Sequence, residues 1–287
     1  MEYNFRSGET MSESLNKLIE LAIAEDLDGG VDITSNATIP ADQASVAQFV
    51  NRQPGVVAGT SVAIAVLNFV GVTNISLLVA DGHLVPAGTV ILEARGNTRA
   101  LLLAERTALN FLTHLSGIAT ETRTWVEAVT GTHCQIRDTR KTTPGWRVLE
   151  KAAVRAGGGT NHRLSLSDAA LIKDNHIVAA GGVLKAFQLV RKQFPDKEIE
   201  VEVDNFEQLH EVLSAKPDLI LLDNMSPELC KEAVAMVAGR VKLEASGGIT
   251  LANALQYAQS GVDYLAVGAL THSAKALDIG LDLKMGI

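Results

Sequence analysis

Basic side chains gather between Arg137 and His176, and their number there favours the binding of a small anion. The segment holds eight lysines and arginines against four acids, a local balance of +4; because the whole chain carries −8, the remainder carries −12. A positive region within an acidic protein attracts small anions and concentrates them. Guanidinium groups bind a carboxylate or a phosphate through two parallel hydrogen bonds. The candidate binding residues are Arg140, Lys141, His162, Arg163 and Lys173.

Other residues of the same segment have simpler explanations. Arg147, Lys151 and Arg155 are spaced four apart, as on one face of a helix, so we favour a solvated helix face or a scaffold role for them. The three glycines at 157–159 permit positive φ or a close approach to a ligand, with a plain flexible loop as the alternative. Taken alone, His162 would be a structural histidine; because it follows those glycines, we favour a place in the site.

Two loops rich in small residues follow the last expected strands, and they suit a phosphate group. One loop precedes a helix that we expect to begin near Leu251, and the other ends the next strand. Backbone amides in such loops and at helix N-termini bind phosphate. A Gly-Gly pair alone would be weak evidence, but two loops on consecutive late strands favour a phosphate site. Its residues would be Ser246, Gly247, Gly248, Val267, Gly268 and Ala269.

Two carboxylates, Glu202 and Asp223, stand at the ends of neighbouring expected strands. They would repel a bound anion unless magnesium bridged them to phosphate oxygens while keeping several of its waters. We therefore predict a phosphorylated substrate that binds together with magnesium. The alternative is that each acid forms a structural ion pair with a nearby lysine.

Several function classes lack support in the sequence. The charge of −8 and the 4% of aromatic residues argue against nucleic-acid binding. No GxSxG, HExxH or GxxxxGK motif and no convincing Ser, His, Asp order supports acyl-transfer, zinc or P-loop chemistry. Cys134 and Cys230 lack CxxC spacing and nearby histidines, so we predict buried free thiols. No uncharged apolar run of about 18 residues and no signal-peptide pattern is visible, so we expect a cytoplasmic protein.

The elements that must position these residues fall into two groups. Up to about residue 115 the pattern is α+β, and beyond it short runs of valine, isoleucine and leucine alternate with helical stretches. In the first group we expect helices at 15–23, 61–70 and 98–115, strands at 45–50, 75–80 and 90–94, and a polar loop at 26–40. In the second we expect strands at 134–137, 169–172, 199–203, 219–222, 241–244 and 264–267, and helices at 183–193, 206–214, 227–238 and 251–260.

The second group predicts a parallel α/β barrel, because its strands read as buried on both faces and are separated by helices. An open doubly wound sheet is the competing architecture, but no GxGxxG follows the first strand of a βαβ unit. Active sites of α/β barrels lie at the carboxyl ends of the strands. The run from Asp138 to Lys141, Lys173, the two carboxylates and the two glycine loops all stand at such ends.

Longer strings resemble one known family specifically. They are AERTALNFL (104–112), LSGIAT (115–120), DTRKTTPG (138–145), GGGTNHR (157–163), LIKDNHI (171–177), LLDN (221–224) and EASGGIT (244–250). In this order they closely resemble quinolinate phosphoribosyltransferases, also called carboxylating nicotinate-nucleotide pyrophosphorylases. The resemblance covers nearly the whole chain beyond its N-terminal end.

The resemblance implies a reaction and an architecture. Quinolinate and 5-phosphoribosyl 1-pyrophosphate would give nicotinate mononucleotide, pyrophosphate and carbon dioxide, with Mg²⁺, in NAD biosynthesis. An N-terminal α/β sandwich would span 1–115 and be joined by the C-terminal tail 273–287, and an incomplete barrel of about seven strands would span 116–272. A head-to-tail homodimer is also implied, in which Arg106 of one subunit reaches the quinolinate of the other. Whether dimers assemble into hexamers stays open.

The resemblance also divides the candidate residues between the two substrates. The residues implied to bind the dicarboxylate are Arg140, His162, Arg163 and Lys173, with Thr139 beside them and Arg106 from the neighbouring chain. Lys141 would contact phosphoribosyl pyrophosphate or the developing charge. The ribose hydroxyls and magnesium would bind to Glu202 and Asp223, partly through phosphoribosyl pyrophosphate and water. The 5-phosphate would bind to Ser246, Gly247, Gly248 and Gly268, and the implied catalytic residues are Lys141, Lys173, Glu202 and Asp223.

Two other functions stay open at this point. A related phosphoribosyltransferase for another pyridine or heterocyclic acid would need only one strong carboxylate site, and the excess of basic residues speaks against it. A catalytically silent metabolite-binding subunit would be expected to lack some of the four implied catalytic residues, and all four are present.

Overall fold

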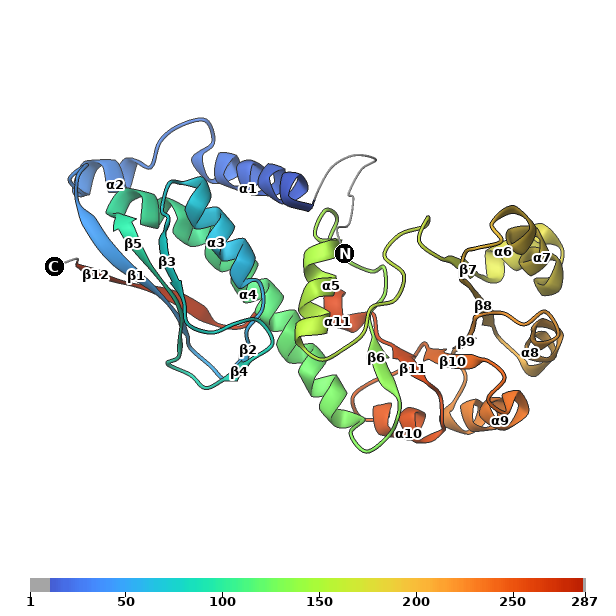
Figure 1. Cartoon of the computed structure of the whole chain (residues 1–287). Coiled ribbons are helices and arrows are strands. Elements are labelled where there is room, and N and C mark those ends of the chain that lie inside the picture. Colours follow the sequence, from blue (N-terminus) through green and yellow to red (C-terminus); the bar gives the residue numbers. More distant parts are fainter. Residues whose placement is uncertain (1–10, 286–287) are drawn as a thin grey trace. The chain divides into compact units, whose positions relative to one another are not determined.

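The computed structural model describes residues 11–285, and the chain forms two compact units (Figure 1). The first unit takes in the chain up to Thr120 and again from Ala274, and the second is Glu121–Ser273. The chain therefore leaves the first unit, completes the second without interruption, and returns to the first.

The first unit is built on a four-stranded antiparallel sheet with the order β12-β1-β5-β3. Its strands are β1 (Ala44–Asn51), β3 (Asn74–Leu77), β5 (Val90–Asn97) and β12 (Ile279–Met285). Along β1 the side chains of Ser45, Ala47 and Phe49 are buried, because alternate residues of a strand point to the same face. The remaining elements are α1 (Met11–Leu27), α2 (Ile33–Thr38), α3 (Thr60–Phe69), the first part of α4 (Thr98–Ala128), β2 (Gly55–Val56) and β4 (Leu84–Val85).

The expected helices and strands of this unit are confirmed, and two segments differ for local reasons. The polar loop expected at 26–40 contains α2, whose N-cap Asp32 accepts a hydrogen bond from the Ser35 backbone N–H at 2.9 Å. Helix α4 continues to Ala128, beyond the end expected at residue 115. A Cβ at Gly117 would lie 2.1 Å from the Lys275 carbonyl oxygen, so glycine there admits the returning C-terminal segment.

The second unit holds a six-stranded parallel sheet with the order β6-β11-β10-β9-β8-β7, which confirms the incomplete α/β barrel. Its strands are β6 (Gln135–Arg137), β7 (Ala170–Ile172), β8 (Ile199–Val203), β9 (Leu219–Asp223), β10 (Lys242–Ser246) and β11 (Tyr264–Ala266). Its helices are α5 (Arg147–Ala156), α6 (Asp174–Ala180), α7 (Val183–Gln193), α8 (Phe206–Leu213), α9 (Pro227–Val237), α10 (Ala254–Gln259) and α11 (Ala269–His272). Figure 1 shows α7, α8, α9 and α10 on the outer side of the curved sheet.

The resemblance implied about seven strands, and beside the six of the sheet the described residues add a single parallel bridge. It joins Arg137 to Thr160, whose backbone N–H donates to the Ile136 carbonyl at 2.8 Å. Among residues 11–285 no strand pairs with the free edge of β7, so the ring of strands is open there. The segment that leads from Thr160 to β7 is loop, and it carries His162 and Arg163.

Strand β8 shows how the barrel interior becomes polar. All five of its residues are buried, and Ile199, Val201 and Val203 share one face. Glu200 and Glu202 share the other, because side chains alternate along a strand. Barrel interiors are usually filled by branched apolar side chains. Here acids take two of the interior positions.

Two further observations bear on the expectations from sequence. Cys134 and Cys230 are buried free thiols, as predicted, and burial raises the pKa of each to about 12. No helix in the part of the chain described here is both long and apolar enough to cross a membrane.

Candidate active site

A cavity of about 650 Å³ opens at the carboxyl ends of the parallel strands in the second unit. Its volume lies within the usual range for a small-molecule site. Of the residues predicted from sequence, it is lined by Thr139, Arg140, Lys141, His162, Arg163, Lys173, Glu202, Asp223, Ser246, Gly247, Gly248, Val267, Gly268 and Ala269. The structure therefore brings together every predicted site residue of the barrel. Arg106 lies elsewhere, exposed on α4 in the first unit, so its role across an interface stays a prediction.

Three polar lining residues were not predicted. Asn224 directly follows β9, Glu244 lies in the middle of β10, and His272 is the last residue of α11. The His272 Nδ1 lies 2.6 Å from Ser273 Oγ, and a Cβ at Gly268 would lie 3.1 Å from His272 Nε2. Nothing in the sequence spacing points to His272. Asn224 could have been predicted, because it directly follows Asp223 at the end of a strand.

Arg140 and Arg163 present guanidinium groups without a carboxylate partner among the described residues. The Nε atom of each is buried and makes no hydrogen bond. Burial lowers the pKa of both, and the neighbouring guanidinium of Arg147 lowers that of Arg140 further. One Arg163 terminal nitrogen donates to the Ala169 carbonyl at 2.9 Å. A bound dianion would neutralise these charges and accept hydrogen bonds from the free N–H groups.

Lys173 and Glu202 form an ion pair with an Nζ to Oε2 distance of 2.5 Å. The sequence left open whether Glu202 forms an ion pair with a nearby lysine, and the structure shows this pair. Asp223 accepts a hydrogen bond from Asn224 at 2.7 Å. Burial raises the pKa of Asp223, and the Glu202 and Asp204 carboxylates raise it further. An excess of carboxylate oxygen at this point fits a hard divalent cation such as Mg²⁺.

The glycines of the two late loops are required by their surroundings. Gly247 has φ +87°, and a Cβ there would lie 2.0 Å from Asn224 Oδ1. At Gly268 a Cβ would lie 3.1 Å from the Lys141 Cδ, so the glycine lets the lysine stem pass. The Lys141 carbonyl also accepts a hydrogen bond from Thr271 Oγ1 at 2.8 Å. The Lys141 loop and the β11 loop are therefore held against each other.

The three glycines at 157–159 serve packing. A Cβ at Gly159 would lie 2.8 Å from the Thr122 Cγ2 and 2.9 Å from the Val154 Cγ1, and Gly158 has φ +94°. None of the three lines the cavity. Their conformational freedom lets the chain turn tightly after α5 rather than approach a ligand.

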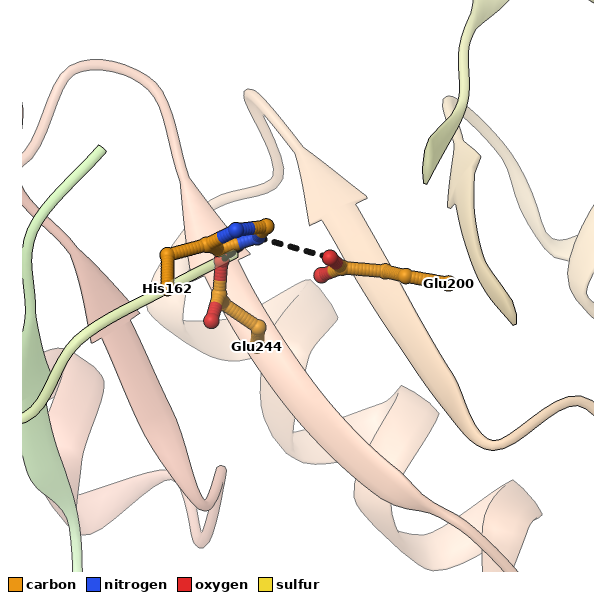
Figure 2. A group of neighbouring side chains, drawn as sticks. All are labelled: His162, Glu200 and Glu244. Carbon is orange, nitrogen blue, oxygen red and sulfur yellow. Dashed lines mark ion pairs between the residues drawn. The ribbon is translucent and has the colours of Figure 1, made fainter. Parts of the chain in front are cut away.

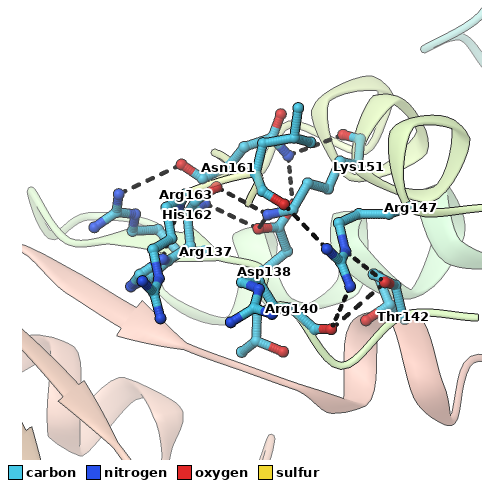
Figure 3. A network of polar contacts seen from close by, with 12 residues as sticks. Arg137, Asp138, Arg140, Thr142, Arg147, Lys151, Asn161, His162 and Arg163 are labelled. Atoms are coloured by element: carbon cyan, nitrogen blue, oxygen red, sulfur yellow. Dashed lines mark hydrogen bonds and ion pairs between the residues drawn. The ribbon is translucent and has the colours of Figure 1, made fainter. Parts of the chain in front are cut away.

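Helix α5 carries a buried ion pair, so the expectation of a solvated face is wrong for Lys151. Its side chain is 1% exposed and pairs with Asp138, as Figure 3 shows. Asp138 also accepts from the His162 backbone N–H at 2.9 Å and from Asn161 Nδ2 at 2.5 Å. Burial is the largest influence on both pKa values: it raises that of Asp138 and lowers that of Lys151. The remaining hydrogen bonds offset part of the cost of burying the charges.

Arg147, at the start of α5, joins two loops of the site. Its guanidinium donates to Thr142 Oγ1 at 3.0 Å and to the Leu164 carbonyl at 3.2 Å (Figure 3). It also reaches the Arg140 carbonyl at 3.5 Å. Arg155, at the other end, donates to the Asn161 side chain. Of the two roles expected for these arginines, a solvated helix face or a scaffold, both residues have the scaffold role.

His162, Glu200 and Glu244 form a buried cluster inside the barrel (Figure 2). The His162 Nε2 lies 2.7 Å from Glu200 Oε2 and 3.4 Å from Glu244 Oε1. Burial lowers the pKa of His162 to about 4 and raises the pKa of each glutamate to about 7. The second oxygen of Glu244 accepts from Arg137 at 2.8 Å.

An incomplete α/β barrel with unpaired guanidiniums, two carboxylates and two glycine loops at its carboxyl rim defines an enzyme that acts on a small anionic substrate. Comparison with known proteins agrees with this class. Residues 32–116 and 118–282 match the family models of the quinolinate phosphoribosyl transferase N-terminal and C-terminal domains. The chain belongs to the quinolinate phosphoribosyltransferase family.

Individual relatives cover almost the whole chain. A carboxylating nicotinate-nucleotide pyrophosphorylase of Mycobacterium leprae is 53% identical over 271 residues, which are 92% of this chain and 95% of that protein. A probable enzyme of the same name from Bacillus subtilis is 41% identical over 94% of each chain. The solved nicotinate-nucleotide pyrophosphorylase from Francisella tularensis is 39% identical and superposes with a TM-score of 0.91, over 98% of this chain and 100% of that one.

Proposed function

We propose that this chain transfers the phosphoribosyl group of 5-phosphoribosyl 1-pyrophosphate to quinolinate with decarboxylation. The products are nicotinate mononucleotide, pyrophosphate and carbon dioxide, in the biosynthesis of NAD. Membership of the family and the names of its relatives support this reaction. The observation on the site that carries it is the pair of guanidiniums of Arg140 and Arg163, which have no carboxylate partner among the described residues and line a cavity of small-molecule size.

The dicarboxylate binds on the basic side of the cavity. Arg140 and Arg163 have free N–H groups that match carboxylate oxygens, and Lys173 supplies a third positive charge. His162 and Thr139 line the same side. Lys173 is already paired with Glu202, so in the complex its ammonium group interacts with both the Glu202 carboxylate and the substrate carboxylate.

Phosphoribosyl pyrophosphate takes the side with the glycine loops. Its 5-phosphate binds the loop of Ser246, Gly247 and Gly248 and the loop at Gly268. Lys141 neutralises the pyrophosphate or the charge that develops on it. Glu202 and Asp223 bind the ribose hydroxyls and would hold magnesium, which supplies charge neutralisation for the leaving pyrophosphate.

The reaction needs alignment and charge stabilisation more than proton transfer by the protein. The ring nitrogen of quinolinate bonds to C1 of the ribose while the bond from C1 to pyrophosphate breaks, with its electron pair leaving on pyrophosphate. Arg140 and Arg163 align the ring, and Lys141 stabilises the leaving group. The nitrogen is then cationic and stabilises the electron pair left on C2 when carbon dioxide departs, after which C2 takes a proton from solvent.

We also propose a homodimer in which Arg106 of each subunit completes the quinolinate site of the other. The exposed position of Arg106 on α4 is compatible with such a contact. A mixture of two inactive variants tests it. Arg106→Ala and Arg140→Ala proteins, mixed in equal amounts and allowed to exchange subunits, should regain about a quarter of wild-type activity, because half of the dimers are mixed and each mixed dimer has one intact site of two. No regain despite subunit exchange would contradict the shared site.

The reaction itself is tested by incubating the protein with Mg²⁺, phosphoribosyl pyrophosphate and quinolinate labelled in its 2-carboxylate. We expect equal amounts of labelled carbon dioxide and nicotinate mononucleotide. Nicotinate in place of quinolinate is the control, and it should give no turnover. Turnover of nicotinate without turnover of quinolinate would favour the related transferase for another acid, and no turnover of either would favour the metabolite-binding subunit.

A further inference from the structure

We propose that Glu200 and Glu244 are positioning residues for this reaction, which hold the ring of His162 from inside the barrel and thereby fix Arg163 at the dicarboxylate site. The kinetic part of this inference rests on the proposed function. Its structural part, the state of the His162 ring, does not.

The two glutamates occupy places that are costly for acids. Glu200 is 4% exposed and Glu244 is fully buried, and one oxygen of each makes no hydrogen bond. An isolated carboxylate is strongly disfavoured in such surroundings. Their partners are few: the His162 ring for Glu200 and the Arg137 guanidinium for Glu244, whose other oxygen lies 3.4 Å from the ring nitrogen. Acids kept at this cost in the interior of the barrel indicate a role that apolar side chains could not fill.

Every polar atom of His162 is engaged within the protein. Its backbone N–H donates to Asp138 at 2.9 Å, and its carbonyl accepts from Lys151 at 2.9 Å. Its Nδ1 accepts the backbone N–H of Arg163 at 2.7 Å. Because Nδ1 is an acceptor, the ring proton lies on Nε2, which faces the two glutamates. His162 therefore acts on substrate through the residues it holds, since no ring nitrogen is left for a carboxylate.

The residue held most directly is Arg163. The hydrogen bond from its backbone to the His162 ring ties the direction of the chain to the orientation of that ring. The Arg163 guanidinium lines the cavity and keeps a free Nε. On the other side, Asp138 immediately precedes the loop that carries Arg140. The cluster thus couples the ring orientation to both dicarboxylate-binding arms.

The same cluster also fixes the neighbouring wall. Arg137 donates to Glu244, and its guanidinium stacks on the Tyr264 ring with 4.4 Å to the ring centroid. Arg137 is 14% exposed and does not line the cavity. Its charge offsets that of Glu244 rather than binding substrate. The interior layer is therefore a connected set in which each buried acid has a defined partner.

Four variants and one control separate a positioning role from general destabilisation. Glu200→Gln keeps an oxygen acceptor for the ring N–H, and Glu244→Gln keeps one for the Arg137 guanidinium, whereas Glu200→Leu and Glu244→Leu remove these acceptors. Val201→Ala is the control, because Val201 is buried in the same strand on the opposite face. It should lower the melting temperature without changing the ratio of the two KM values.

Leaving a buried donor unsatisfied should raise the KM for quinolinate about tenfold in each Leu variant, while the KM for phosphoribosyl pyrophosphate stays within about threefold. The Gln variants should stay within about threefold of wild type for both. Leu variants with a wild-type KM for quinolinate would overturn the inference. An equal rise of both KM values, as from general damage, would overturn it too.

A spectroscopic readout keeps the test independent of activity. The chain has seven histidines, and His162→Gln identifies the signal of this one in ¹⁵N–¹H spectra of imidazole-labelled protein. We expect a neutral ring protonated on Nε2 at pH 6 and 7, shifted in both Leu variants and kept in both Gln variants. If quinolinate is not turned over but this signature is present, the proposed function fails and the positioning cluster stands.

The same three side chains could instead bridge a metal ion, since their ligand atoms lie within 4.8 Å of one another. The contact between His162 and Glu200 at hydrogen-bonding distance and the nearby Arg137 charge favour a shared proton. Zinc bound at one ion per chain in protein purified without chelator, and lost in Glu244→Gln, would overturn the hydrogen-bonded cluster.

Discussion

Lys151 and Asp138 form an ion pair that is almost completely buried, with side chains 1% and 0% exposed, between helix α5 and the end of β6. The pair joins the helix to the loop that begins with Thr139 and Arg140. It does not line the cavity, and it shares Asp138 with His162 and Asn161. Its part in the enzyme is therefore to hold the basic arms in place.

Lys151→Met should destabilise the second unit by about 3–5 kcal/mol, because it leaves the Asp138 charge buried without its partner. Arg155→Ala, on the exposed end of the same helix, should cost less than about 1 kcal/mol. Urea unfolding of both variants gives the comparison. The double change Lys151→Met with Asp138→Asn should cost less than the sum of the single changes, and strict additivity would argue against a coupled pair.

Arg140→Ala should weaken quinolinate binding by about 2–5 kcal/mol, because it leaves carboxylate charge unpaired. The change should appear as a higher KM for quinolinate in the decarboxylation assay. Arg240→Ala is a suitable control, since the Arg240 side chain lies outside the cavity lining and hydrogen-bonds to carbonyls of α9. An unchanged affinity for quinolinate in the Arg140 variant would count against the assignment.

Gly247→Ala should impair the use of phosphoribosyl pyrophosphate more than Gly248→Ala does. Both positions have positive φ, so each substitution carries strain of about 1–3 kcal/mol. Only at Gly247 would the new Cβ also collide with Asn224, whereas the space beside Gly248 is open. Steady-state KM values for phosphoribosyl pyrophosphate measure the difference. Equal effects would mean that the loop is shaped by strain alone.

Glu202→Gln should raise the Mg²⁺ concentration needed for half-maximal activity, by about tenfold for the loss of one carboxylate ligand. It should also release Lys173 from its present partner, so the KM for quinolinate should not rise. Titration of activity with MgCl₂ at saturating substrates tests the first expectation. An unchanged magnesium requirement would mean that Glu202 binds Lys173 and the ribose hydroxyls but not magnesium.

The stability of Glu244→Gln should change with pH differently from that of the wild type. Burial raises the pKa of Glu244 from 4.5 to about 7 in the folded chain. An acid with a raised folded-state pKa stabilises the fold below pH 4.5 and loses that contribution as the pH rises through 7. The wild type should therefore lose stability between pH 5 and 8 relative to the variant. Melting temperatures of both proteins at these two pH values test the sign, and parallel behaviour would contradict it.

Much of the site could be predicted because parallel strands end on one rim. Lys173, Glu202 and Asp223 are far apart in sequence, yet each lies at or beside the carboxyl end of a strand and all three line one cavity. The positions of apolar runs identified those strands, and a one-residue shift in their bounds moved none of the rim residues away. The barrel architecture therefore explains why most of the site residues lie together.

The interior of the barrel could not be predicted in the same way. Glu200 lies within an apolar run, and nothing local shows that its face is lined by His162 and Glu244. Lys151 was expected on a solvated face, because spacing by four residues shows that side chains share a face but not what covers it. The surroundings of Glu200 and of Lys151 are both set by contacts between segments that are distant in sequence. That information is absent from any single helix or strand.

Strand β12 sets the order in which the two units can be completed. Its residues pair with β1 from Ser45 to Asn51, so the sheet of the first unit lacks this edge strand until synthesis has passed the whole barrel. All six strands of the barrel, in contrast, lie between Gln135 and Ala266 and leave the ribosome earlier. The unit that starts first is thus finished last. During translation the incomplete barrel can therefore fold while the sheet of the other unit still lacks its edge strand.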